Sequence, residues 1–326
     1  MTTSQRHIGP ALLGALWWLA TSATAHAQSA PDPDAGSEPV APDSAARPVS
    51  ARPSSDSTDG GVRWFQSREP FAPLIADPLE TQIRGSIVSA DLDVEEIEGA
   101  DPGGLEVLTG RHAEADVAVG YRQNVVQFQS ESPGRPAIAL AFEVGVFTRF
   151  LLDTPEKDFI SADFRVGLPF QIAYSGWEGR VEILHMSSHF GDDIFSRLGL
   201  TNAQVTFDGF QLIAARRLIP PVRLYVGGSF NFHSNPGVEE LAAQWGVEWD
   251  ESAVSRSGHV WPLVAADFRI TDETERVAGT ALAGATFRIS GTRLQLSVRG
   301  HFGPSTIGKF RNIDENFIGL GLRIIP

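Results

Sequence analysis

The chain has 326 residues, a net charge of −14 and no cysteine. Its length allows one large domain or two smaller ones, and its acidic balance argues against nucleic acid as a partner, because a phosphate backbone requires a basic face. The 32 glycines, 21 prolines and 20 phenylalanines favour strands and turns over helices. The lack of cysteine is typical of a chain that passes through an oxidising compartment without mispairing.

Residues 1–27 have the features of a signal peptide. Arg6 precedes a short apolar run, Ala11 to Ala20, and small residues follow at Ala25 and Ala27. The run is too short to span a membrane and leads to an A-x-A pattern, so we expect cleavage after Ala27 and export through the periplasm. No later stretch is long and apolar enough for a membrane helix.

Two segments separate the signal peptide from the rest of the chain. Residues 28–62 contain six prolines and neither leucine nor an aromatic residue. Such a segment buries too little apolar surface to offset the entropy of ordering, so we expect a disordered linker. Residues 63–81 include REPFAPLIADPLE, whose prolines favour an extended chain and whose apolar residues need cover. We interpret 63–81 as an extended periplasmic segment, either a strap or a partial plug.

Apolar and polar residues alternate through most of the remaining chain, 82–326. We count about twelve such segments, which begin near residues 82, 113, 137, 159, 178, 203, 221, 242, 261, 278, 292 and 315. Alternation with a period of two indicates a strand with one apolar face. Most segments are about 9–13 residues long, which suits membrane-spanning strands better than the shorter strands of soluble sandwiches.

The polar face of these segments carries charges of both signs at mid-strand. Glu143 lies between Phe142 and Val144, for example, and Asp163 and Arg165 lie on the polar face of the next segment. An apolar face toward lipid and paired charges toward the lumen are typical of outer-membrane barrels. We therefore predict an all-β fold, a closed antiparallel transmembrane β-barrel of about twelve strands, in the outer membrane of a Gram-negative bacterium.

This fold implies membrane lipid and the barrel assembly machinery as partners. A barrel of about twelve strands with many inward charges leaves little open channel. The first functional hypothesis is therefore a structural or narrow-pore role, with a charge-filled lumen.

The stretch GRVEILHMSSHFGDD, from Gly179 to Asp193, places a polar cluster at the outer end of the fifth predicted strand. Alternation puts Val181 and Ile183 on the lipid face. Continued, it puts three polar residues on that same face: His185, Ser187 and His189. The other alternative is a β-bulge that resets the register and returns His185 to the lumen.

The outward alternative suggests an acyl hydrolase. A histidine and a serine two residues apart on one strand face have Cα atoms about 6.5–7 Å apart, so the imidazole can activate the hydroxyl. His185 as general base and Ser187 as nucleophile resemble the arrangement in outer-membrane phospholipase A and lipid A deacylases, and their substrate would be lipid of the outer leaflet. Ser188 or His189 would help to hold the oxyanion.

An imidazole of this kind needs a third group that orients it. Asn202 is the nearest candidate in the sequence. However, parity with Val205 and Phe207, which we expect on the lipid face, turns Asn202 inward unless a bulge intervenes.

The polar cluster has simpler interpretations as well. A strand end that enters an outer loop is polar because it is solvated. Zinc would need both His185 and His189, which an extended strand holds about 13 Å apart. Calcium at Asp192 and Asp193 would need further oxygen ligands from elsewhere. We predict no cofactor and leave calcium open.

Three blocks of the sequence carry a resemblance to a known family: FAPLIADPLE from Phe71, HMSSHFGDD from His185 and RLYVGG from Arg223. Through them, residues 64–326 resemble a bacterial family of uncharacterised predicted outer-membrane β-barrels with a His-x-Ser-Ser-His-x-Gly-Asp block. Phe190 and Asp193 replace the Leu and Glu of that block. The resemblance implies the barrel and its location, and no established activity.

Overall fold

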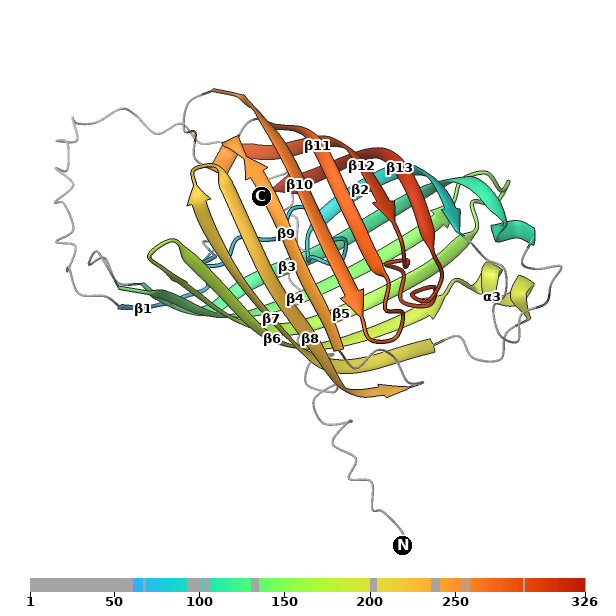
Figure 1. Cartoon of the computed structure of the whole chain (residues 1–326), viewed down its shortest axis with the longest axis horizontal. Helices are drawn as coiled ribbons and strands as arrows, with labels where there is room; N and C mark the ends of the chain where they lie inside the picture. Colours follow the sequence, from blue (N-terminus) through green and yellow to red (C-terminus); the bar gives the residue numbers. More distant parts are fainter. Residues whose placement is uncertain are drawn as a thin grey trace, which may run out of the picture. The chain divides into compact units, whose positions relative to one another are not determined.

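A closed antiparallel barrel of twelve strands, β2 to β13, makes up the described part of the chain (Figure 1). The computed structural model describes residues 61–66, 69–92, 101, 106–129, 135–199, 204–235, 241–253, 255, 258–289 and 291–325. The predicted signal peptide, 1–27, and the predicted linker up to residue 60 lie outside these residues. The predicted fold class is confirmed.

The strands follow one another around the ring, each paired antiparallel with the next, and β13 pairs with β2 to close it. Their bounds are β2 Ile83–Leu92, β3 Gly110–Gln129, β4 Ala137–Leu151, β5 Phe159–Tyr174, β6 Trp177–Phe190, β7 Gln204–Ile219, β8 Val222–Asn235, β9 Leu241–Asp250, β10 Val260–Thr271, β11 Val277–Ile289, β12 Thr292–Phe302 and β13 Glu315–Ile325. The predicted starting points agree with these bounds. The largest difference is three residues, between 113 and Gly110.

One additional strand, β1, Gly61–Trp64, pairs with Val126–Gln129 of β3. The β2–β3 pairing begins only at Arg84 and Ala118, so the later part of β3 extends beyond its neighbour and leaves an edge that β1 partly covers. The last two residues of the predicted linker, Gly61 and Val62, are therefore strand residues, because this free edge offers their backbone a partner.

The barrel has a turn end and a loop end. At the turn end, connections are mostly short, and residues 175–176 join β5 to β6. Ser175 and Gly176 both have positive φ, 49° and 81°, as the tight two-residue hairpin turn requires. At the loop end, longer connections carry a 3-10 helix, η1 (Glu106–Leu108), and a short helix, α3 (Asp192–Leu198). None of the helices in the described ranges is long and apolar enough to cross a membrane.

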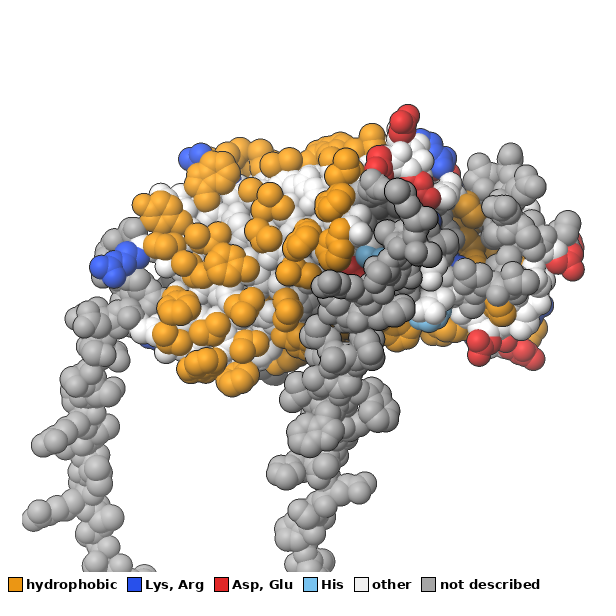
Figure 2. Space-filling model, turned by 90° about the horizontal axis from the view of Figure 1, so that it is seen from below, with side chains coloured by type: hydrophobic (Ala, Val, Ile, Leu, Met, Phe, Trp, Pro, Cys, Tyr) orange, Lys and Arg blue, Asp and Glu red, His pale blue; other side chains and the backbone are white. Residues whose placement is uncertain are grey.

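The outer surface of the barrel is apolar. Hydrophobic side chains cover much of the face seen in Figure 2, and exposed residues such as Ile87, Val226 and Leu320 are each more than 60% accessible. An apolar band of this kind stabilises a barrel in lipid. In water the same apolar surface would remain exposed, which is unfavourable.

The inner surface is charged. The buried acids and arginines of the strands are Glu114, Asp116, Glu143, Arg149, Asp163, Arg165, Arg180, Glu182, Arg223, Glu248, Asp267, Arg299 and Glu315. Most of them pair with an opposite charge, as Arg165 does with Glu143 at 2.8 Å. Buried charges require such partners, because removal from water otherwise costs several kcal/mol per ion.

Two parts of the chain obstruct the lumen. Residues 69–82 lie inside the barrel, in the half nearer the turn end. Phe71, Leu74 and Glu80 of this segment are almost inaccessible to solvent. At the loop end, the connection 303–314 folds inward. Its Ile307 and Phe310 join a hydrophobic cluster with residues of β2, η1, β4, β5, β6 and α3.

Candidate functional site

The polar cluster predicted on the fifth barrel strand lies on β6, and its parity follows the outward alternative. Val181 and Ile183 are about half exposed, and His185 continues on the same outer face, while Leu184 and Met186 between them are buried. The registers of β6 with β5 and with β7 run without a break through this stretch. No β-bulge therefore turns His185 into the lumen.

Ser187 lies between two polar neighbours on this outer face. Its Oγ is 2.9 Å from Nε2 of His189, two residues farther along β6. Gln204, at the start of β7, donates a hydrogen bond from Nε2 to the same oxygen at 3.2 Å. The hydroxyl can thus donate to an imidazole while it accepts from an amide.

His185 has a different partner. Its Nδ1 is 2.8 Å from Oδ1 of Asp208, which lies directly opposite on β7. The two side chains are 45% and 38% exposed. A carboxylate on Nδ1 fixes the imidazole and leaves Nε2 free, which is the arrangement that a catalytic base requires.

Apolar side chains surround these polar residues. Phe164 of β5 lies opposite Ser187 in the β5–β6 register, and its ring meets the His189 ring edge-on at 5.8 Å between centroids. On β7, Phe210 follows Asp208 on the outer face and packs on Phe232 of β8 at 5.2 Å. The site therefore combines a hydroxyl, two imidazoles and a carboxylate with an apolar surface.

The structure reverses the parity that we expected for β7. Val205 is 3% exposed and faces inward, whereas Gln204, Thr206 and Asp208 lie on the outer side. The expectation was wrong because it assumed that the apolar side chains of Val205 and Phe207 face lipid. In the structure these residues line the inside, where the loop end of the barrel contains apolar as well as charged groups.

The other predicted site residues are dispersed. Asn202 lies outside the described residues. Ser188 faces the lumen and is fully buried. Asp192 and Asp193 begin α3 rather than lying in an irregular loop, and Oδ2 of Asp193 is 3.5 Å from the Phe159 backbone N–H, which donates to it. Among the described residues, no group of three or more His, Cys, Asp or Glu is placed to hold a metal ion.

Gly191 sets the path of the chain from β6 into α3. Its N–H donates to the Ile160 carbonyl at 2.8 Å, and a Cβ at this position would overlap the Phe159 carbonyl oxygen. The glycine of the HMSSHFGDD block is therefore required by close backbone contact with β5. This contact fixes the end of β6 on which Ser187 and His189 lie.

Sequence reasoning missed Asp208 and Gln204. One feature of the sequence could have identified Asp208. It lies two and four residues before Phe210 and Leu212, which are exposed apolar residues of β7, so its carboxylate shares their face of the strand. An acid on a lipid-facing stripe is unusual and marks a functional candidate. Its pairing with His185 depends on the β6–β7 register, which alternation alone does not define.

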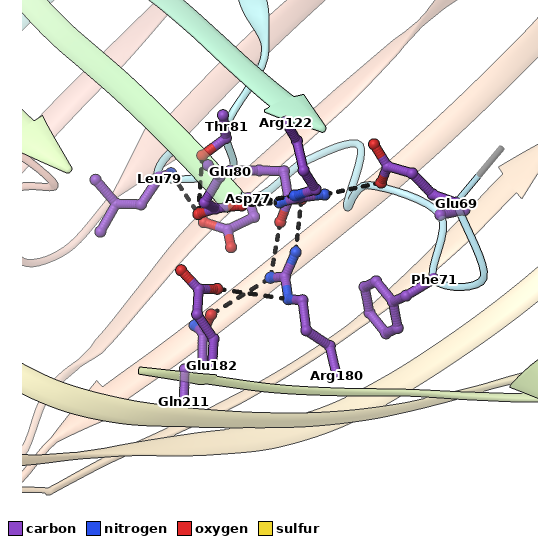
Figure 3. Close-up of polar contacts among 12 residues, drawn as sticks. Glu69, Phe71, Asp77, Leu79, Glu80, Thr81, Arg122, Arg180, Glu182 and Gln211 are labelled. Carbon is purple, nitrogen blue, oxygen red and sulfur yellow. Dashed lines mark hydrogen bonds and ion pairs between the residues drawn. The ribbon is translucent and has the colours of Figure 1, made fainter. Parts of the chain in front are cut away.

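A second polar network joins the luminal segment to the barrel wall (Figure 3). Arg180 of β6 donates two hydrogen bonds to Glu80, at 2.7 and 2.9 Å, and Arg122 of β3 donates a third at 2.8 Å. Arg122 also contacts Glu69 at 3.1 Å. Burial by itself raises the pKa of Glu80, but Arg180 and then Arg122 outweigh burial and lower that pKa to about 2.

The backbone of the luminal segment is recognised as well. The N–H groups of Phe71, Ala72 and Ile75 donate to side chains of the wall, at 2.7–3.2 Å. The Phe71 ring lies between two guanidinium groups, 4.8 Å from Cζ of Arg180 and 4.7 Å from Cζ of Arg223. The segment is therefore bound inside the barrel along its length, and its part from Glu69 onward lies in the lumen rather than across the barrel mouth.

The comparisons with solved structures support the fold. An outer membrane phospholipase dimer from Salmonella typhi, solved with bound calcium, is 12% identical, with a TM-score of 0.53 over 80% of this chain and 94% of that one. Outer membrane phospholipase A from Escherichia coli is 13% identical, with a TM-score of 0.52 over the same shares. LpxR from Salmonella typhimurium is 14% identical, with a TM-score of 0.35 over 74% of this chain and all of that one. No curated protein matches the sequence.

The two phospholipase structures, with TM-scores above 0.5, show a shared barrel architecture and nothing about activity. A family model matches the sequence from residue 38 to residue 324. This agrees with the resemblance of residues 64–326 to an uncharacterised family. The chain belongs to the family described as "Protein of unknown function (DUF1207)".

Proposed function

We propose that this chain is an integral barrel of a bacterial outer membrane and a serine acyl hydrolase that acts on lipid of the outer leaflet. The observation that carries the proposal is the His185–Asp208 pair, 2.8 Å apart, beside Ser187 on an apolar outer surface. A histidine and a carboxylate that contact each other on a lipid-facing surface are costly there, so chemistry is the better reason for the pair.

In the proposed mechanism, Ser187 is the nucleophile and His185 is the general base. The Ser187 hydroxyl attacks the ester carbonyl of a lipid while its proton passes to Nε2 of His185. Asp208, on Nδ1, holds the ring and stabilises the imidazolium. The imidazolium then gives the proton to the leaving alcohol, and water releases the acyl group from the serine by the same steps.

His189 and Gln204 have supporting roles in this proposal. In the resting site they hold the Ser187 hydroxyl, at 2.9 and 3.2 Å. When the carbonyl is attacked, the Gln204 amide supplies a donor for the oxyanion, and His189 supplies a second one in the tautomer that carries its hydrogen on Nε2. Rotation of the serine side chain from His189 toward His185 precedes the attack, as hydrogen bonds in unliganded sites often tighten only with substrate.

The orientation in the membrane follows from the loops. In outer-membrane barrels the long connections are outside and the short turns are periplasmic. The site lies near the loop end of β6, so its apolar surroundings, Phe164 among them, are at the level of the outer leaflet. Lipid is therefore the substrate that the site contacts.

The experiment is hydrolysis of labelled phospholipid, and separately of lipid A, by the purified barrel in mixed micelles. Removal of Ser187 by Ser187→Ala should lower turnover by about three orders of magnitude or more. Ser188→Ala is the matched control, since its hydroxyl faces the lumen, and should retain parental turnover. Equal rates for the parent and Ser187→Ala, or no turnover by the parent with and without calcium, reject the hydrolase.

The same assay distinguishes the roles of His185 and His189. His185→Asn should lower kcat by at least the factor seen for other general bases, about 10²–10⁴, and His189→Asn by less. The reverse order would move the role of base to His189 and leave the hydrolase itself intact.

A second candidate is a non-catalytic barrel with a structural or narrow-pore role, and the bound luminal segment favours its closed, structural form. Glu80 and Phe71 fill the lumen toward the turn end, and Ile307 and Phe310 obstruct the loop end. Planar-bilayer recordings test this point. We expect no stepwise conductance from the full chain in potassium chloride, and steady channels would support the pore instead.

A further inference from the structure

A cavity remains inside the barrel between the luminal segment and the inward-folded connection 303–314. It has a volume of about 100 Å³. Asp77 to Leu79 border it on the side of the segment. Pro304 to Thr306 and Gly308 border it toward the loop end. A space of this size holds several waters or a small molecule.

The carboxylates of this cavity differ from the other buried carboxylates of the protein. Eight buried acids each have an arginine within 4.0 Å: Glu80, Glu114, Asp116, Glu143, Asp158, Glu182, Glu248 and Glu315. The three remaining buried acids among the described residues are Asp77, Asp163 and Asp267, which have no ion pair within the described ranges. All three line the cavity.

Two of these acids lie close together. A single amide nitrogen, Nε2 of Gln244, donates to Oδ2 of Asp77 at 3.0 Å and to Oδ2 of Asp267 at 2.8 Å. The Tyr225 hydroxyl donates to Asp267 as well, at 2.6 Å. These donors are neutral. Arginines such as Arg165 and Arg269 also line the cavity. However, none of the ion pairs within 4.0 Å among the described residues involves Asp77 or Asp267, so the two carboxylates lack a direct counter-ion there.

The third acid adds unpartnered polar atoms to the same cavity. Asp163 is 4% exposed and accepts from the Gly308 N–H at 3.0 Å, while its second oxygen, Oδ1, has no hydrogen-bond partner. Oγ of Ser188, which is fully buried and also lines the cavity, has none either. Buried polar atoms without partners mark a place where a ligand or ion completes the structure.

We infer that this cavity binds a small organic amine, whose ammonium groups the three unpaired aspartates recognise. An ammonium supplies three donors and a charge, which are what Asp77, Asp163 and Asp267 lack. A metal ion fits less well, because no group of three ligating side chains in the described part of the chain converges on one point. Leu184, Met186 and Phe207 on the wall provide an apolar surface for the carbon part of the amine.

The luminal segment fills the barrel toward the turn end, and the connection 303–314 covers part of the loop end. The amine therefore enters beside the β10–β11 connection, whose Glu273 and Thr274 line the cavity. The cavity is separate from the outer lipid-facing site. Ser188 faces the cavity while its neighbour Ser187 faces outward, so the two sites are on opposite sides of β6. The inference therefore stands or falls independently of the proposed hydrolase.

The test is isothermal titration calorimetry of the full chain in detergent micelles. The probes are 1,4-diaminobutane, the neutral analogue 1,4-butanediol, and calcium chloride. We expect saturable binding of the diamine, no binding of the diol, and weaker diamine binding as ionic strength rises. Absence of diamine binding at millimolar concentration overturns the inference, as does equal binding of the diol. Calcium binding in place of diamine binding overturns the assignment to amines.

Variants locate the site. Asp163→Asn and Asp267→Asn should each weaken diamine binding at least tenfold, and Asp153→Asn, an exposed acid at the loop end, should leave it unchanged. Heat-modifiable gel mobility verifies that each variant is folded. Ser188→Ala serves as a mild fourth variant, expected to weaken binding less than either aspartate change. Diamine binding that is equal in the parent and in both folded aspartate variants would place the amine elsewhere and overturn the inference.

Discussion

Glu80 and Arg180 form a bidentate ion pair inside the barrel, with Nη–Oε distances of 2.7 and 2.9 Å. Glu80 belongs to the luminal segment and Arg180 to β6, a hundred residues later in the chain. This pair, with Arg122, attaches the segment to the wall at the point where it continues into β2.

Replacing the carboxylate at this point should destabilise the barrel. Glu80→Gln removes one counter-ion from both Arg180 and Arg122, and breaking a buried ion pair costs about 3–5 kcal/mol. The measurement is the free energy of unfolding in urea, with the barrel in lipid vesicles. Glu69→Gln is the matched control, because the Glu69 side chain is 20% exposed and pairs with a single arginine, Arg122, among the described residues. It should cost about 1 kcal/mol. Equal costs for the two variants would contradict the role of Glu80.

The same carboxylate predicts a pH dependence. The pKa of Glu80 is about 2 in the folded chain against an ordinary value of 4.5, because Arg180 and Arg122 outweigh the burial that raises it. A depressed pKa contributes stability that is fully present above about pH 4.5 and is lost as pH falls through about 2. The difference in unfolding free energy between the parent and Glu80→Gln should therefore shrink, by on the order of 3 kcal/mol, over that range. A difference that stays constant from pH 6 to pH 2 would contradict the ion pairing.

Phe71 should be the main apolar anchor of the luminal segment. Its ring is fully buried between the guanidinium groups of Arg180 and Arg223. Phe71→Ala removes both cation–π contacts and leaves a cavity, for an expected loss of about 3–5 kcal/mol. Phe71→Tyr keeps the ring, and Phe71→Leu keeps most of the volume. The unfolding free energies should rank with alanine lowest and leucine next, and equal values for leucine and the parent would exclude the cation–π contribution.

Asp208→Asn tests the orienting carboxylate of the outer site. The amide keeps the size of the side chain but loses the charge that stabilises the His185 imidazolium, so kcat for lipid should fall by about 10²–10⁴ with little change in KM. Thr206→Val, on the same face of β7 and opposite Ser187, is the control for altered packing. If Asp208→Asn and Thr206→Val have the same small effect on kcat, Asp208 has no orienting role.

Gly191→Ala should disturb the end of β6 without touching any polar residue of the site. Its methyl group would overlap the Phe159 carbonyl oxygen, so β5 and the start of α3 must separate. We expect a lower unfolding midpoint and loss of the ordered position of His189, measured by hydrogen exchange of the 187–195 amides. Parental protection of these amides in the variant would show that the close contact is not maintained in the membrane.

The sequence alone was enough to predict the barrel, its strand starts and the inward charges. Alternation with period two is a local property, and in most strands it indicates which face is apolar and turned outward. The outward direction of His185 and Ser187 followed from parity with Val181 and Ile183, because β6 pairs regularly with both neighbours through this stretch. The acid that orients His185 could not be found in this way, since the β6–β7 connection leaves the register open.

Tertiary structure decided the relationships between distant parts of the chain. The register of β6 with β7 brings Asp208 to His185, and no local pattern encodes which residue lies opposite which. Apolar Val205 faces inward because the loop end of the lumen is partly apolar, so hydrophobicity alone gave the wrong side. The position of Glu80 between Arg122 and Arg180 follows from the closure of the barrel, which brings residues of separate strands around the luminal segment. The sequence alone identified this segment only as extended, with apolar residues that must be buried somewhere.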